Sequence, residues 1–219
     1  MTLSHHQSPP YTPPAPNHLV TLYIDEHVII ADKPSGLLSV PGKGPEKAQC
    51  AQSILNDRHS SALTVHRLDM DTSGVIVFAR TKDAQRYLSR GFERRLTEKH
   101  YVAVVAGVVP DASGVIDFPI AKHSLQGPLR HIAPDGQEAI THWQVLERGE
   151  TSTRLSLSPT TGRSHQLRLH LSVFGHAILG DSLYGDPASA ERLLLHAEAL
   201  SFSHPGTENR MSFNAPLPF

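Results

Sequence analysis

The chain has 219 residues, a length that fits one catalytic domain and not two of full size. Hydrophobic residues make up 39% of it, which excludes disorder or a collagen-like repeat as the main state of the chain. The 20 lysines and arginines and 21 acidic residues give a formal net charge of −1, so any contact with nucleic acid depends on local rather than overall positive charge.

The N-terminal segment differs in composition from the rest of the chain. Residues 1–17 contain five prolines and no formal charge, a composition that predicts a flexible tail. Residues 18–219 are expected to form a single folded domain. Neither an export signal nor a membrane-spanning stretch is apparent, and the single cysteine, Cys50, excludes an internal disulfide. We therefore expect a cytoplasmic protein without membrane contact.

The first predicted elements are strands. Two β-rich runs, 19–24 and 28–31, are separated by a short polar break and predict a hairpin. A loop rich in proline and glycine follows at 33–42, and the polar stretch 42–64 indicates no definite element. Residues 74–80, GVIVFAR, are apolar and β-branched enough to predict a buried strand.

A helix is predicted over residues 83–96, with Thr81 as its N-cap, because apolar residues recur there at helical spacing. Its opposite face is locally basic through Arg86, Arg90 and Arg94. Such a face is usually solvated, although it also suits contact with RNA phosphates.

The second half of the chain is predicted to contain mainly strands. The predicted strands cover 100–107, 114–120, 140–146 and 153–159, and the predicted helices cover 164–174 and 187–195. Strands outnumber helices and rarely alternate with them. The expected class is therefore α+β, a single domain with a mixed, largely antiparallel sheet flanked by helices and loops.

Two polar segments could carry chemistry. The first, HRLDMDTSG at 66–74, places a carboxylate beside an arginine in a loop before a buried strand, although its last four residues would also suit an ordinary turn. The second, 160–170, follows a predicted strand. Arg163 lies near its predicted helix start, where the helix dipole disfavours a cation, so a partner carboxylate or phosphate would explain it.

Other kinds of site find little support. His165 and His170 are five residues apart, which separates them by about 140° around a helix and argues against a shared metal. Phosphate-binding loops, dinucleotide-binding fingerprints, nucleophile elbows and zinc-protease motifs are absent from the sequence.

The sequence resembles the RluA-type pseudouridine synthases, which isomerise uridine to pseudouridine within RNA. The segment 66–74 looks like their signature loop. Further segments agree in the same order, at 31–42, 99–107, 160–171, 175–185 and 192–197. The resemblance implies the pseudouridine synthase fold in its short, single-domain form, with an active-site cleft across the sheet. Asp32 departs from the expected asparagine, and the stretch 122–135 is divergent.

The resemblance also implies catalytic roles. Asp69 is expected to act on the ribose, either by attack at C1′ or by proton removal at C2′, and the sequence does not choose between the two. Arg163 is expected to pair with Asp69 and favour its ionised form. Tyr101 is expected to stack on the extruded uracil, although a half-buried strand tyrosine would look the same in sequence. The isomerisation gains no atoms and needs no redox step, so neither cofactor nor metal is expected.

The expected partner is RNA, a stem-loop of large-subunit rRNA, of the tRNA anticodon arm, or of both. Arg67 resembles the arginine that enters the RNA where the target base leaves, His66 is assigned to substrate, and Leu195 is expected beneath the pocket, with Leu194 as a competitor. Candidates for phosphate contacts, chosen by charge, are Arg86, Arg90, Arg94, Lys122, Arg130, His131 and Arg168. A monomer is the default expectation.

Two other functions stay open. A catalytically silent RNA-binding module of the same fold would be expected to have lost the aspartate or the arginine, and both are present. A hydrolase or metal-dependent enzyme that uses the histidines would require a histidine spacing that this chain does not show.

Overall fold

The structure is a computed structural model that describes residues 10–123 and 129–219. Its helices are α1 (Ala51–His59), α2 (Lys82–Glu93) and α3 (Gln166–Val173). Its strands are β1 (Val20–Ile24), β2 (Val28–Lys33), β3 (Leu63–Thr64), β4 (Ser73–Ala79), β5 (Glu98–Ala106), β6 (Ser113–Ile116), β7 (Ile120–Lys122), β8 (Arg130–Ile132), β9 (Thr141–Arg148), β10 (Ser152–Pro159), β11 (Leu195–Ser203) and β12 (Arg210–Asn214).

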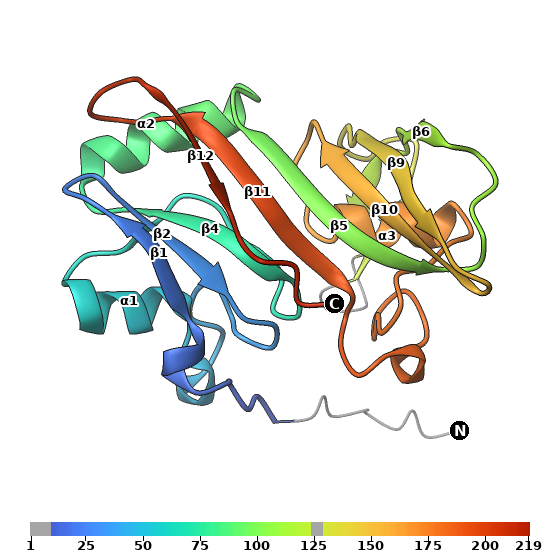
Figure 1. Cartoon of the computed structure of the whole chain (residues 1–219). Helices are drawn as coiled ribbons and strands as arrows, with labels where there is room; N and C mark the ends of the chain where they lie inside the picture. The colour runs from blue at the N-terminus through green and yellow to red at the C-terminus, as the bar shows by residue number, and fades with distance from the viewer. Residues whose placement is uncertain (1–9, 124–128) are drawn as a thin grey trace.

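One wide sheet organises the domain (Figure 1). Its strands run in the order β1-β2-β4-β11-β5-β10-β9-β6, with β3 beside β4 and β12 beside β11, while β7 and β8 form a separate hairpin. The pair β4–β11 is parallel and the other described pairs are antiparallel. The expected α+β class with a mixed, largely antiparallel sheet is therefore confirmed.

The two halves of the sheet meet along a short seam. β4 pairs with β11 only at His196 and Ala197, and β12 pairs with β11 from Ala199 onward. Figure 1 shows α1 and α2 beside the half that contains β1, β2 and β4, whereas α3 lies behind β10 in the other half. Loops from the first half and residues of α3 are thereby brought toward one another.

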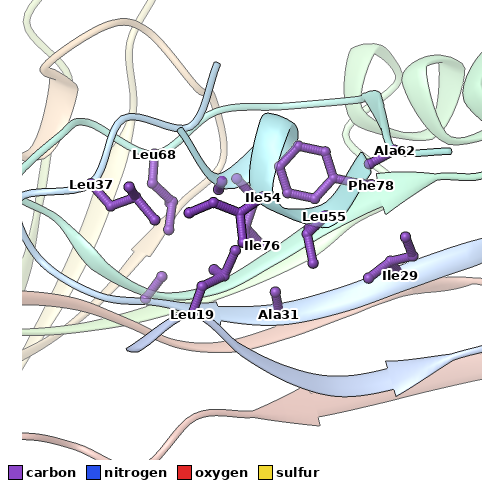
Figure 2. Close-up of a cluster of buried hydrophobic side chains, with 12 residues drawn as sticks. Leu19, Ile29, Ala31, Leu37, Ile54, Leu55, Ala62, Leu68, Ile76 and Phe78 are labelled. Carbon is purple, nitrogen blue, oxygen red and sulfur yellow. The ribbon is translucent and has the colours of Figure 1, made fainter. Parts of the chain in front are cut away.

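A hydrophobic core anchors the loops of the first half (Figure 2). All seven residues of β4 are buried, and Ile76 and Phe78 pack with Ile54 and Leu55 of α1. Leu37 and Leu68 from two loops join the same cluster. Burial of one leucine side chain contributes roughly 1.5–3 kcal/mol, so these two residues attach their loops firmly to the sheet.

The hairpin, the strand before Thr81 and the first predicted helix are found where they were expected. Thr81 caps α2 by accepting a hydrogen bond from the Ala84 N–H at 3.1 Å. The predicted strands at 100–107, 140–146 and 153–159 correspond to β5, β9 and β10, and the predicted helix at 164–174 corresponds to α3.

The predicted helix at 187–195 is wrong. The structure has a single 3-10 turn at Pro187–Ser189, and Leu195 already begins β11. β11 pairs with β4 on one side and with β5 on the other. These pairings determine its conformation, because a central strand is hydrogen-bonded along both edges and its side chains are buried.

α1 was not predicted. Its N-cap is Cys50, an uncommon capping residue, whose sulfur accepts from the Ser53 N–H at 3.4 Å. The Ser53 hydroxyl in turn accepts from the Cys50 N–H at 2.9 Å, so the two residues form a capping box.

The expected flexible tail is only partly described, because residues 1–9 lie outside the described residues. From Tyr11 onward the chain is attached to the domain, contrary to expectation. The Tyr11 hydroxyl donates to the Gln49 carbonyl and accepts from the Leu38 N–H, both at 3.0 Å. Within the described ranges, no helix has the length and apolar character needed to cross a membrane.

Candidate active site

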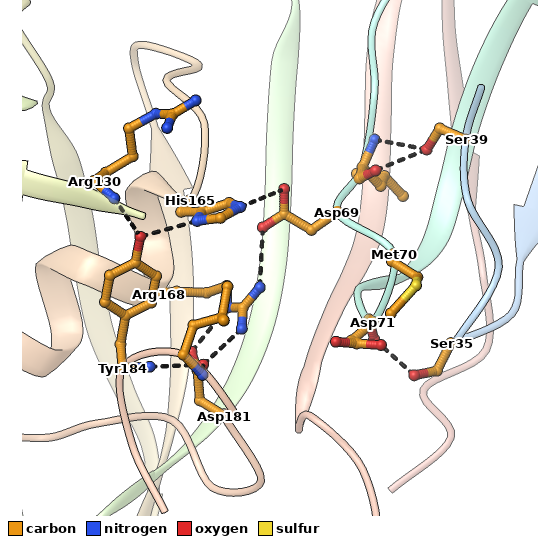
Figure 3. A network of polar contacts seen from close by, with 12 residues as sticks. Ser35, Ser39, Asp69, Met70, Asp71, Arg130, His165, Arg168, Asp181 and Tyr184 are labelled. Carbon is orange, nitrogen blue, oxygen red and sulfur yellow. Dashed lines mark hydrogen bonds and ion pairs between the residues drawn. The ribbon is translucent and has the colours of Figure 1, made fainter. Parts of the chain in front are cut away.

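Asp69 lies in the loop between β3 and β4, and serine hydroxyls from the loop after β2 hold the backbone of this loop in place (Figure 3). The Ser39 hydroxyl donates to the Leu68 carbonyl at 2.7 Å and accepts from the Leu68 N–H at 3.1 Å. The Ser35 hydroxyl donates to the Asp71 carbonyl at 2.7 Å. These bonds hold the backbone on both sides of Asp69, while 27% of its side chain stays exposed to solvent.

Lys33 ties the same two loops together from inside the protein. Its Nζ donates to the carbonyls of Pro34, Leu37 and Met70 at 3.0, 2.7 and 2.9 Å, and the residue is fully buried. Burial lowers the pKa of Lys33 to about 7, although the nearby carboxylates of Asp71 and Asp69 act in the opposite direction. No role was assigned to Lys33 from the sequence. Its position at the end of a buried strand is the feature of the sequence that could have indicated a structural role.

We expect Lys33→Met to destabilise the protein and slow its reaction, because three carbonyls, of which that of Leu37 is buried, lose their donor and the loop that carries Asp69 loses an anchor. An unsatisfied buried group costs about 1–3 kcal/mol, so thermal unfolding and activity should both report the change. Lys43→Met is the matched control, since Lys43 is exposed. Unchanged stability and activity in Lys33→Met would contradict this role.

Arg168 of α3 faces the Asp69 carboxylate. Its Nη1 lies 3.5 Å from Asp69 Oδ2. The same guanidinium is held by Asp181, with Nε to Oδ2 at 2.8 Å and Nη2 to Oδ1 at 2.6 Å. Asp181 is fully buried, and Arg168 is 3% exposed. The bidentate pair therefore presents a fixed positive charge to Asp69.

The expected pairing of Arg163 with Asp69 is wrong. Arg163 precedes the first residue of α3 by three positions, and its Nε donates to the Glu138 carbonyl at 2.9 Å. Among the described residues, the ion-pair partners of Asp69 are Arg168 and His165. Arg168 was expected to contact phosphate, and its burial against Asp181 makes that assignment wrong as well.

His165 and Tyr184 complete the polar groups around Asp69. His165 Nε2 lies 3.9 Å from Asp69 Oδ1, and its Nδ1 is hydrogen-bonded to the Tyr184 hydroxyl at 2.9 Å. The Tyr184 ring lies 5.7 Å from the Arg168 guanidinium carbon, close enough for a cation–π contact. Neither residue was assigned to the site from the sequence, where His165 was considered only as a metal ligand.

Tyr101 and Leu195 come from the two central strands. Tyr101 on β5 is half-buried and packs against the cores of both halves of the sheet. Burial, followed by the Asp69 carboxylate, raises the pKa of Tyr101, so its hydroxyl is protonated at neutral pH. Leu195 on β11 is 3% exposed in the core of the second half, whereas Leu194 is half-buried. Tyr101 is thus within electrostatic reach of Asp69.

The residues that precede Asp69 differ in surroundings. Arg67 is exposed, two positions before Asp69. The His66 ring instead stacks on Phe92 of α2 at 4.6 Å and accepts from the Val77 N–H at 3.1 Å. Burial lowers the pKa of His66 to about 3, consistent with this accepting role. These contacts give His66 a role in the fold, and its expected contact with substrate stays a prediction.

The remaining candidates for phosphate contact fall into two groups. Arg86, Arg90 and Arg94 are exposed along α2, although Arg86 also pairs with Asp83. On the β7–β8 hairpin, Lys122 and His131 are exposed and Arg130 is half-buried.

Comparison with known proteins identifies the family to which this chain belongs. A family model described as RNA pseudouridylate synthase matches residues 27–173. The chain is 45% identical over 214 residues to the "Dual-specificity RNA pseudouridine synthase RluA" of Escherichia coli strain K12, covering 95% of this chain and 98% of that protein. The protein of the same name from Pasteurella multocida is 44% identical over the same shares.

A solved structure extends the agreement to the fold. "Human RNA Pseudouridylate Synthase Domain Containing 1" superposes with a TM-score of 0.79 at 27% identity, covering 95% of this chain and 87% of that one. The chain therefore belongs to the RNA pseudouridylate synthase family and is an enzyme of the RluA-like kind. The family resemblance inferred from the sequence is confirmed.

Proposed function

We propose that this enzyme isomerises uridine in a structured RNA through the Asp69 carboxylate. The observation that carries the proposal is the state of Asp69: partly exposed, fixed by backbone bonds on either side, and opposite the buried Arg168–Asp181 pair. A carboxylate placed in this way can attack ribose C1′ or remove the C2′ proton. Arg168 acts as a positioning residue that supplies charge and orientation to Asp69.

The target base must leave the RNA stack to reach Asp69, which costs a few kcal/mol. The aromatic ring of Tyr101, whose hydroxyl keeps its proton, is suited to stack on the extruded uracil, a contact of about 1–3 kcal/mol. Exposed Arg67 is suited to occupy the place that the base leaves. The isomerisation moves the glycosidic bond from N1 to C5 of the same uracil and conserves all atoms, so the proposed reaction requires no cofactor.

We propose large-subunit rRNA and tRNA stem-loops as substrates. This rests on the dual specificity named for relatives 45% identical over 95% of the chain. The test is incubation of the purified enzyme with transcripts of both RNAs, followed by mapping of pseudouridine at each uridine. Conversion at one defined uridine in each RNA supports the proposal. Conversion in only one RNA would overturn dual specificity, and conversion in neither would favour a silent RNA-binding module.

The affinity for RNA is expected to fall as salt concentration rises. For single-stranded contacts, the slope of log affinity against log salt is about 0.7 per phosphate. If Arg90 and Arg94 each contact a phosphate, Arg90→Gln/Arg94→Gln should reduce the slope by about 1.4. Lys43→Gln, which changes an exposed lysine in another loop, serves as the control. An unchanged slope in the double variant would show that these two arginines do not contact RNA phosphates.

A further inference from the structure

The Tyr184 hydroxyl joins the backbone of Arg130 to the ring of His165, and His165 faces Asp69 (Figure 3). It accepts a hydrogen bond from the backbone N–H of Arg130 at 2.9 Å and lies 2.9 Å from His165 Nδ1. Burial is the main cause that raises the pKa of Tyr184, so the hydroxyl keeps its proton at neutral pH. That proton requires an acceptor. Among the described contacts of the Tyr184 hydroxyl, His165 Nδ1 is the atom that can accept it.

The contacts on both sides of the His165 ring select one tautomer. If the Tyr184 hydroxyl donates to Nδ1, the proton of the neutral ring is on Nε2. Nε2 faces the Asp69 carboxylate at 3.9 Å, and an N–H there is attracted to the carboxylate, whereas a lone pair would be repelled. The backbone of His165, the residue before α3, is in the left-handed conformation, with φ of 58°.

Burial keeps the His165 ring neutral at neutral pH. Burial lowers the pKa of His165, an effect to which the cations of Arg168 and Arg130 add, while the carboxylates of Asp69 and Asp181 act in the opposite direction. A neutral ring with a fixed tautomer offers one N–H, at the Nε2 atom that lies near Asp69.

The separation between His165 and Asp69 leaves this donor available. A distance of 3.9 Å exceeds the range of about 2.7–3.2 Å for an N–H···O bond, so the Nε2–H is aimed toward the carboxylate without being bonded to it. We propose that, in the reaction proposed above, His165 Nε2–H donates to the 2′-hydroxyl oxygen of the target ribose. The inference rests on the proposed function.

The 2′-hydroxyl is the acceptor that the geometry favours. Asp69 must approach C1′ or C2′ in either version of the chemistry, and the 2′-oxygen is bonded to C2′ and two bonds from C1′. A donor beside one Asp69 oxygen therefore lies next to that hydroxyl. The 2′-hydroxyl can accept this bond and still donate its own proton, and it distinguishes RNA from DNA. Tyr184 then acts as a positioning residue that fixes the His165 tautomer.

Binding measurements test the hydrogen bond between His165 and the 2′-hydroxyl by removing each partner separately and then both. Asp69→Asn protein is titrated with stem-loop RNA that carries either uridine or 2′-deoxyuridine at the target position, and the same titrations are repeated with Asp69→Asn/His165→Ala. One hydrogen bond contributes about 1 kcal/mol, so removal of the 2′-hydroxyl should weaken binding about fivefold when His165 is present and less than about twofold when it is absent. Equal penalties in the two proteins, including no penalty in either, would overturn the assignment.

Single-turnover kinetics provide the second readout. His165→Ala should slow pseudouridine formation about tenfold, His165→Gln should restore part of the rate because its amide keeps an N–H donor, and Tyr184→Phe should fall between wild type and His165→Ala. The control is His142→Gln, which alters an exposed histidine on β9. A wild-type rate in His165→Ala overturns the inference alone. An inactive wild-type enzyme overturns the proposed function and the inference with it.

Discussion

Asp69→Asn is expected to lower the single-turnover rate of pseudouridine formation by about 10³-fold or more, a loss typical when a group that makes or breaks bonds is removed. The asparagine amide has nearly the size of the carboxylate but can neither attack C1′ nor remove a proton from C2′. The backbone bonds that position the loop involve Leu68 and Asp71 and are unaffected by the substitution. Fold and RNA affinity should therefore change little.

Asp71→Asn provides the matched control. Asp71 lies in the same loop, two residues further along, and the bond that fixes it uses its backbone carbonyl. The same change of carboxylate to amide at this position should leave the rate within a fewfold of wild type. If Asp69→Asn kept a comparable rate, or if Asp71→Asn lost as much, Asp69 would not be the reacting carboxylate.

Arg168→Met is expected to cost both stability and activity. The substitution leaves the fully buried carboxylate of Asp181 without its cation, and breaking a buried ion pair in this way costs about 3–5 kcal/mol. It also removes the positive charge opposite Asp69. Denaturant unfolding should show the first effect, and single-turnover kinetics on the remaining folded enzyme should show the second.

Two further variants separate these effects. Arg168→Met/Asp181→Asn removes the unpaired buried charge while keeping an oxygen that can accept from the N–H groups of Leu183 and Tyr184, so stability should partly return but activity should stay low. Arg163→Gln should leave the Asp69–Arg168 pair in place and reduce the rate much less than Arg168→Met. If the Arg163 variant lost more activity than the Arg168 variant, the result would favour the pairing of Arg163 with Asp69 and contradict the structure.

Local sequence patterns predicted much of the fold. The strand at 74–80, its Thr81 cap and the following helix depend on composition and spacing within a few residues, and they were predicted closely. β11 depends instead on partners far along the chain: Leu195 pairs with Ala103, and His196 pairs with Ser73. The leucine-rich run that leads into it is compatible with a helix until those partners are known.

The candidate site was predicted in part for the same reason. Asp69 stands in a distinctive motif, whereas Arg163 and Arg168 both lie in one short segment, and the family resemblance together with the helix-dipole argument pointed to the wrong arginine. α3 begins only at Gln166, so Arg163 is not part of the helix, while Arg168 lies on its buried side with Leu167 and Leu171. An arginine among buried leucines requires a buried partner, but the identity of that partner, Asp181, depends on the folded chain.

The most direct measurement of the central claim is a map of pseudouridine in total RNA from cells that lack this gene, complemented with either the wild-type gene or its Asp69→Asn form. We predict that specific uridines of large-subunit rRNA and tRNA lose their modification in the deletion strain, recover it with the wild-type gene and stay unmodified with Asp69→Asn. Identical maps for the two complemented strains would contradict the account.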